Sequence, residues 1–125
     1  MIPVLTTEEM RAADVAAASS LAPGALLARA GVAVGSVAAT MLGRTYGRRV
    51  AIIVGPGFNG VDGHLAGEYL QQRGVRVIEY SLTELPVSIE GVDLVIDAAF
   101  GIGCTRPFVA PRVIGDIPVL AVDLP

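Results

Sequence analysis

A continuous apolar run meets a glycine-rich turn near the middle of the chain. The run is Val50-Ala51-Ile52-Ile53-Val54, and Gly55-Pro56-Gly57-Phe58-Asn59-Gly60 follows it at once. An apolar run of this length without alternation is typical of a parallel strand that is covered on both faces. Parallel strands need crossover connections, which are usually helical. The feature therefore predicts an open α/β sheet with right-handed crossovers.

Other segments of the chain supply the remaining elements of such a sheet. Further strands are expected over about 75–80, 92–97 and 119–123. Helices are expected over about 6–18 and 25–42, and from the glycine-rich turn to about 73, where Gly74 is placed to cap the last of them. The path from Asp97 to Val119 is short for a crossover helix. In the helix over 25–42 the apolar spacing puts one set of residues on a single face, namely Leu27, Ala30, Val34, Val37 and Met41.

The composition excludes several classes of function. With 125 residues, of which 53% are apolar, the chain has the size and core of one domain. All nine basic residues are Arg, which excludes Schiff-base chemistry and a Lys-dependent phosphate loop. One His and one Cys cannot form a Cys/His zinc cluster or a disulfide framework. A net charge of −3, with no basic cluster beyond Arg44, Arg48 and Arg49, argues against nucleic-acid binding.

The N-terminal region bears on localisation. Its first 14 residues include Glu8, Glu9, Arg11 and Asp14, which does not fit the cationic and then apolar layout of a signal peptide. The uncharged stretches 15–28 and 30–43 are each too short to span a bilayer. We therefore expect a soluble, cytoplasmic protein with no membrane partner.

Polar residues gather where three of the expected strands end. Asn59 and Asp62 follow the first strand, Asp97 ends the third and Asp123 ends the fourth. The carboxyl ends of parallel strands line one edge of a sheet, and ligands bind in the crevice there. The sequence thus predicts one site at this edge.

The turn matches Gly-x-Gly-x-x-Gly at Gly55, Gly57 and Gly60, between a strand and a helix. Such a turn brings the backbone and a helix N-terminus close to a pyrophosphate. An ordinary dinucleotide-binding dehydrogenase, with Glu79 on the ribose, is therefore one interpretation. It leaves Asp97 and Asp123 unexplained.

Three segments together resemble a known family more specifically. They are Gly55 to Gly63, then Asp97-Ala98-Ala99-Phe100-Gly101-Ile102-Gly103, then Ala121-Val122-Asp123-Leu124-Pro125. In order and spacing they resemble the YjeF N-terminal domain family of NAD(P)H-hydrate epimerases. The N-terminal stretch 5–14 and the segment 26–31 are similar to the family's two N-terminal helices, so the resemblance covers essentially the whole chain.

The resemblance implies a Rossmann-like three-layer α/β/α sandwich with a mainly parallel sheet, and an isomerase of metabolite repair. The enzyme would interconvert the R and S forms of hydrated NADH or NADPH. It implies a potassium ion held by Asn59 and Asp97, and Asp123 as the catalytic residue. The substrate would contact Asp123 and two loops, made of Phe58, Asn59, Gly60, Val61 and Asp62, and of Gly101, Ile102, Gly103, Cys104, Thr105, Arg106 and Pro107.

The resemblance also implies partners: a second copy in a homodimer, and an ADP-dependent NAD(P)H-hydrate dehydratase, fused or separate. Family members continue beyond the Val-Asp-Leu-Pro motif into Ser-Gly. We therefore expect residues 1–125 to be a YjeF N-terminal-type domain that is incomplete at its C-terminus, with the strand over 119–123 as an uncovered edge of the sheet.

Two positions depart from the family pattern. Phe58 stands where the family has Asn, and Val61 stands where it has Gly. An alternative is therefore a noncatalytic member of the same fold that binds a nucleotide or a protein. For His64 we expect a partly exposed surface position, and for Cys104 a small filler role.

Overall fold

The computed structural model describes residues 2–5, 23–99 and 111–122, and within them the side chains of 29–57, 59–99 and 111–122. Its centre is a five-stranded sheet in which all neighbouring strands are parallel. The strands are β1 (Ile2–Leu5), β2 (Arg49–Val54), β3 (Arg76–Ser81), β5 (Leu94–Ala98) and β7 (Val119–Val122). Their order across the sheet is β1-β7-β5-β2-β3. The predicted parallel α/β sheet is confirmed.

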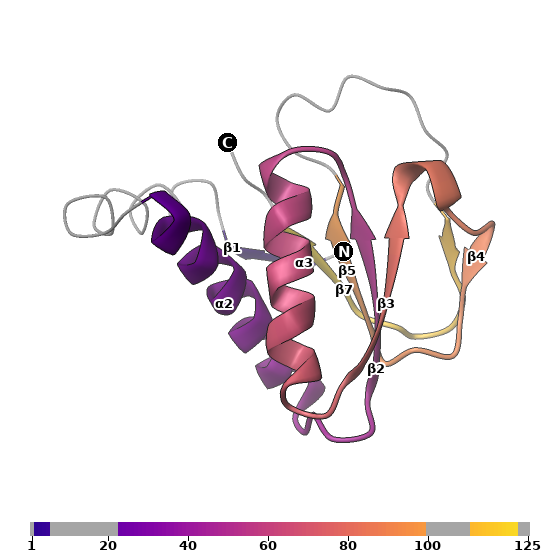
Figure 1. The fold of residues 1–125 in the computed structure, drawn as a ribbon. Coiled ribbons are helices and arrows are strands. Elements are labelled where there is room, and N and C mark those ends of the chain that lie inside the picture. The colour runs from indigo at the N-terminus through magenta and orange to yellow at the C-terminus, as the bar shows by residue number, and fades with distance from the viewer. Residues whose placement is uncertain (1, 6–22, 100–110, 123–125) are drawn as a thin grey trace.

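Two helices, α2 (Pro23–Leu42) and α3 (Phe58–Gln71), cover one face of this sheet (Figure 1). Val34 and Ala38 of α2 and Leu70 of α3 share one buried cluster with Ile52 and Ile96 of the strands. Because strand residues alternate between the two faces of a sheet, Ile52 and Ile96 point toward the helices. Burial of this apolar surface is the main stabilising term for the layer.

The opposite face is covered differently in the described part of the chain. A short 3-10 helix, η1 (Leu82–Glu84), and a two-stranded parallel sheet of β4 (Ser88–Ile89) and β6 (Arg112–Val113) lie over it. Ile89 packs with Ala51, Ile53 and Val95 in a second buried cluster. The short path from Asp97 to Val119 thus includes β6.

Glycines set the packing of α2 on α3. A Cβ atom on Gly31 would lie 2.3 Å from Leu65 Cβ, and one on Gly35 would lie 2.6 Å from Tyr69 Cδ1. The two helices approach closely because these side chains are absent. The predicted apolar face of α2 is confirmed in part, because Val34 is buried in the helix-facing cluster and Ala30 and Met41 pack against it. The buried residues are Gly31, Val34, Gly35, Ala38 and Leu42, whereas Ala30, Val37 and Met41 are half-buried.

The end of α3 follows the glycine signal. Gly74 has a positive φ of 85°, its N–H donates to Gln71 O at 3.1 Å, and Val75 N donates to Leu70 O at 3.1 Å. This pair of bonds is a Schellman motif with glycine at the left-handed position. The predicted C-cap at Gly74 is confirmed.

The N-terminal strand corrects one expectation. The sequence implied that the strand at 119–123 would be an uncovered edge, but β1 pairs with it in parallel, with Ile2 opposite Leu120. The edges of the sheet are therefore β1 and β3. Pro3 fits its position because proline is tolerated on edge strands. The predicted helix over 6–18 lies outside the described residues.

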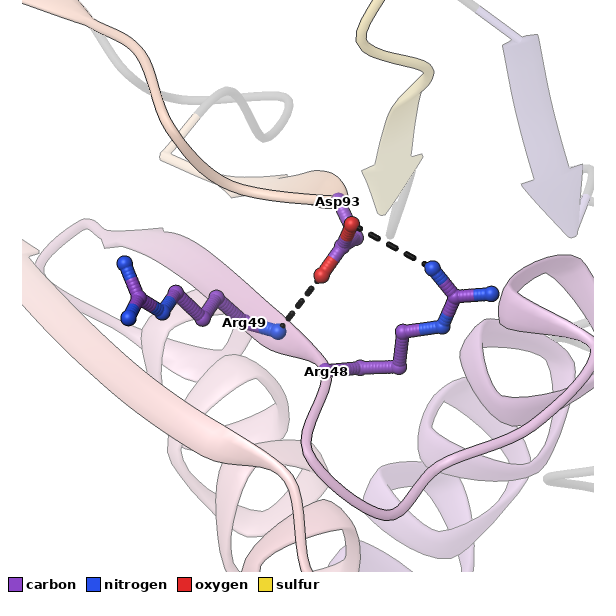
Figure 2. Close-up of polar contacts among 3 residues, drawn as sticks. All are labelled: Arg48, Arg49 and Asp93. Carbon is purple, nitrogen blue, oxygen red and sulfur yellow. Dashed lines mark hydrogen bonds and ion pairs between the residues drawn. The ribbon is translucent and has the colours of Figure 1, made fainter.

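At the amino-terminal edge of the sheet, Asp93 connects the start of β2 with the start of β5 through hydrogen bonds (Figure 2). Asp93 Oδ2 accepts a hydrogen bond from Arg49 N at 2.8 Å, and Asp93 Oδ1 lies 3.4 Å from Arg48 Nη1. In return, Asp93 N donates to Arg49 O at 2.7 Å. These bonds hold the start of β2 beside the start of β5.

Candidate functional site

The chain reverses its direction across the sheet between β2 and β5. From β2 it passes through α3 to β3 on one side, and the next strand of the sheet, β5, lies on the other side of β2. In open α/β sheets, ligands bind at the carboxyl ends of the two strands that flank such a switch point. The glycine-rich turn after Val54 and the residues after Asp97 leave the sheet at this place.

The turn owes its shape to glycine at two positions. Gly57 has φ 102° and ψ −164°, a region that is nearly restricted to glycine. A Cβ atom on Gly60 would lie 1.8 Å from the carbonyl oxygen of Gly55. The turn therefore folds back on itself, and this conformation requires glycine at positions 57 and 60.

Helix α3 begins inside the motif, at Phe58, so Asn59 and Gly60 belong to its first turn. No side chain caps its N-terminus, and the first backbone bond runs from Val61 N to Gly57 O at 3.2 Å. The first amides of a helix and its dipole favour an anion. This geometry fits the predicted contact with a pyrophosphate.

Within the described side chains, the buried polar or charged residues are three of the predicted site residues: Asn59, Asp62 and Asp97. They are 7%, 0% and 4% exposed, although each carries a polar group that is costly to bury. Such burial at the carboxyl edge of a parallel sheet is typical of a functional site.

Asn59 connects the glycine-rich segment with the segment at the end of β7. Its Nδ2 donates to Val122 O at 3.5 Å, which links the start of α3 to the end of β7. This contact points the side-chain amide nitrogen toward β7. The amide oxygen is left as the group that can bind a cation.

Asp97 belongs to β5, which lies between β2 and β7 in the sheet. In the sheet it stands opposite Ile53 of β2 and Ala121 of β7. Its Oδ1 accepts a hydrogen bond from Ala99 N at 3.1 Å, which fixes the carboxylate at the turn that leaves β5. The structure thus brings Asn59 and Asp97 to the same edge of the sheet, as predicted.

The other predicted residues divide into two groups. Val61 is 41% exposed on the first turns of α3, and Gly60 and Asp62 are buried. The side chain of Phe58, the whole segment 101–107 and Asp123 lie outside the described residues. Their assigned roles stay predictions.

Sequence reasoning missed the contacts that assemble the site. The carbonyl oxygen of Val122 accepts a hydrogen bond from Asn59. Gly55 packs so closely on Ala99 that a Cβ atom on Gly55 would lie 2.9 Å from the Ala99 backbone. Both contacts depend on strand register, which residue types alone do not indicate.

His64 has partners of its own on the helical face. Its Nδ1 lies 2.8 Å from Glu79 Oε1 and its Nε2 lies 3.0 Å from Glu68 Oε1. The hydrogen bond to Glu79, together with the charges of both carboxylates, raises the pKa of His64 above its ordinary value. The His64 side chain is 55% exposed, as expected. Because Glu79 is engaged with His64, the structure gives no support to its ribose-binding role.

The chain matches a known protein family. The family described as YjeF-related protein N-terminus matches residues 23–91, which include β2, α3, β3 and the glycine-rich turn. The chain belongs to this family.

Individual members of the YjeF-related family extend the match. The chain is 33% identical to the NAD(P)H-hydrate epimerase of Rhodobacter capsulatus over 163 residues, which covers 100% of the chain and 77% of that relative. The alignment is longer than the 125 residues of the chain, so the relative contains inserted residues.

Two mycobacterial relatives are longer proteins. The chain is 35% identical to the bifunctional NAD(P)H-hydrate repair enzyme Nnr of Mycobacterium tuberculosis over 150 residues. It is 34% identical to the enzyme of the same name from Mycobacterium leprae over 145 residues. It spans about a third of these relatives, covering 32% and 31% of their lengths.

Two features are absent from the described residues. No helix among them is long and apolar enough to cross a membrane. Nor do three or more His, Cys, Asp or Glu side chains gather there in an arrangement that could hold a metal ion.

Proposed function

We propose that this chain catalyses the interconversion of the R and S forms of hydrated NADH and NADPH. The observation that carries the proposal is the contact of Asn59 with Val122 O beside Asp97. It joins segments of the motif at the switch point of the sheet, in a chain that aligns along its whole length with an NAD(P)H-hydrate epimerase.

The helix start supports a role in binding the dinucleotide. Uncapped amides at the N-terminus of α3 attract a pyrophosphate, and the close turn at Gly57 and Gly60 exposes the backbone to it. In the proposal, residues 58–62 and 101–107 hold the substrate, and the Arg106 guanidinium binds a phosphate oxygen.

Asp123 is the proposed catalytic residue. Inversion requires the ring hydroxyl to leave as water and to return on the other face, while the adjacent ring nitrogen stabilises the cation. A carboxylic acid at this point protonates the leaving hydroxyl, and the resulting carboxylate stabilises the cation and takes a proton from the returning water. Asp123 follows Val122 directly, and Val122 ends the strand that Asn59 contacts.

Asn59 and Asp97 are the proposed potassium ligands. An amide oxygen and a buried carboxylate are hard donors, which suit a hard cation. When bound, the ion supplies a positive charge that offsets the buried carboxylate of Asp97. Asn59 and Asp97 hold this charge at the edge of the sheet where the dinucleotide binds.

A direct assay tests the proposal. The purified chain is mixed with the R form of hydrated NADH, with and without potassium, and the S form is followed by chromatography. We expect interconversion that depends on potassium and falls about 10²- to 10⁴-fold in Asp123→Asn. An exposed carboxylate distant from the motif, changed in Asp116→Asn, serves as the control. A wild-type chain that binds nucleotide without interconverting the two forms contradicts the proposal.

A noncatalytic binding role is the second candidate. The observation in its favour is the exposed branched side chain of Val61, in the first turns of α3, where the family pattern has glycine. Val61→Gly separates the two. The variant should have higher epimerase activity than the wild type if Val61 only hinders substrate binding. It should show no epimerase activity if the site is noncatalytic.

The proposal extends to partners and localisation. A cytoplasmic homodimer that passes the S form to an ADP-dependent dehydratase fits the repair activity for which the mycobacterial relatives are named. Size-exclusion chromatography with light scattering tests the dimer.

A further inference from the structure

The fold gathers arginines at the edge of the sheet opposite the candidate site. Arg44 follows α2, Arg48 precedes β2, Arg49 begins β2, Arg73 follows α3 and Arg76 begins β3. Two backbone bonds draw these segments together, from Gly47 N to Gly74 O at 3.0 Å and from Arg76 N to Arg48 O at 2.8 Å. The basic cluster seen in the sequence is therefore larger than residues 44–49, because the fold adds Arg73 and Arg76.

Arg49 and Arg76 are direct neighbours within this group. They occupy the same register position of the parallel pair β2 and β3, so their side chains lie on the same face of adjacent strands. Adjacent strands are about 4.8 Å apart. Both residues are exposed. Like charges in this arrangement repel each other and destabilise the pair.

Neither side chain is neutralised within the described part of the chain. The carboxylate of Asp93 lies nearby, but it binds the backbone N–H of Arg49 and the guanidinium of Arg48. Figure 2 shows the guanidinium of Arg49 extending away from Asp93. Arg73 is occupied differently, with its guanidinium 3.4 Å from the centre of the Tyr69 ring.

We propose that Arg49 and Arg76 form an anion-binding site for a phosphate group, separate from the site at the carboxyl edge. Planar guanidinium groups match phosphate oxygens with paired hydrogen bonds. An anion between the two arginines removes their repulsion. The surrounding arginines create a positive local field on a chain of net charge −3, which steers anions to this edge.

A protective role at the sheet edge is the competing explanation. β3 is an edge strand, and charged side chains on edge strands prevent sheet-to-sheet association. That explanation accounts for Arg76. It does not account for Arg49, because β2 is an interior strand.

The experiment is a titration of the 15N-labelled full chain with pyrophosphate, followed by NMR at low salt. We expect saturable shifts of the amides of Arg49, Arg76 and Asp93, distinct from any shifts over 57–62. Arg49→Gln and Arg76→Gln should each weaken this binding about fivefold, the value of an exposed ion pair of about 1 kcal/mol. Arg112→Gln, which changes an exposed arginine on β6, should leave it unchanged.

A single-stranded oligonucleotide in a second titration distinguishes the sources of the phosphate. Competition with pyrophosphate at the same amides identifies a nucleic-acid backbone as a ligand, and its absence identifies a small phosphate-bearing molecule. Shifts confined to 57–62, or unchanged pyrophosphate binding in the Arg49→Gln/Arg76→Gln double variant, overturn the proposal. The double variant should keep full epimerase activity, so this result is independent of the proposed function.

Discussion

Gly60 lies against Gly55 so closely that any larger residue at position 60 must displace the glycine-rich turn. The contact involves the backbone carbonyl of Gly55, and a Cβ on Gly60 would lie 1.8 Å from its oxygen. Backbone atoms cannot rotate away as a flexible side chain can. The turn that presents the N-terminus of α3 therefore depends on this pair.

Gly60→Ala should destabilise the fold and abolish ligand binding. We expect a loss of about 1–3 kcal/mol in the free energy of unfolding, because the added methyl group overpacks the turn. Urea denaturation measures it. Gly67→Ala is the matched control in the same helix, since its Cβ would meet the terminal Cδ1 of Ile52 at 3.2 Å and alanine is the better helix former. Equal losses in both variants would contradict the special role of Gly60.

Asn59→Ala should weaken the response to potassium. The change removes the amide oxygen and the bond to Val122 O. We expect the potassium concentration for half-maximal activity to rise about tenfold, which corresponds to about 1.4 kcal/mol. Gln72→Ala, which removes an exposed amide beyond the end of α3, should show no such change. An unaltered potassium response in Asn59→Ala would exclude Asn59 as a ligand.

Gly35 and Tyr69 should show energetic coupling between α2 and α3. Gly35→Ala places a methyl group 2.6 Å from Tyr69 Cδ1 and 2.8 Å from Tyr69 Cγ, so it should destabilise the chain. Tyr69→Ala removes both atoms. The double variant should therefore be more stable than the sum of the two single changes implies, by about 0.5–3 kcal/mol. Additive losses in thermal unfolding would show that the Tyr69 ring is not the group that opposes the added methyl group.

Asp93→Ala should cost more than Asp93→Asn. An asparagine oxygen can still accept the hydrogen bond from Arg49 N, whereas alanine leaves that N–H without its acceptor. We expect about 1 kcal/mol for the lost hydrogen bond and less for the lost ion pair, which is part-exposed. Chemical denaturation ranks the two. Similar losses would mean that the Arg48 ion pair, and not the backbone bond, stabilises the strand starts.

The His64 contacts should stabilise the fold only on the acidic side. The pKa of His64 is raised in the folded chain, mainly by its hydrogen bond to Glu79. A raised pKa means that the stabilisation is complete below the unfolded pKa of about 6.5 and is lost as the pH rises through the folded value. Because His64 is largely exposed, the effect should stay below about 1 kcal/mol.

The free energies of unfolding of the wild type and His64→Gln, compared at about pH 5.5 and about pH 9, test this dependence. The difference between the two proteins should be larger at the lower pH. A difference that is constant or grows toward high pH would contradict the assigned direction.

The sequence by itself determined the parallel sheet, the helices α2 and α3 and the edge of the sheet where the candidate site lies. Apolar runs without alternation, such as 50–54, are stable only when both faces are buried, and Gly74 ends its helix by backbone preference. These are local properties of the chain. The proposed ligand-binding residues followed from the resemblance of three motifs, in their order along the chain, to a known family.

Only the tertiary structure decided which residues meet. The pairing of β1 with β7 and the contact of Asn59 with Val122 join residues that are far apart in the chain. The neighbouring positions of Arg49 and Arg76 follow in the same way from the register of β2 and β3. Register and packing depend on the summed burial of the whole sheet, and no short segment encodes that sum.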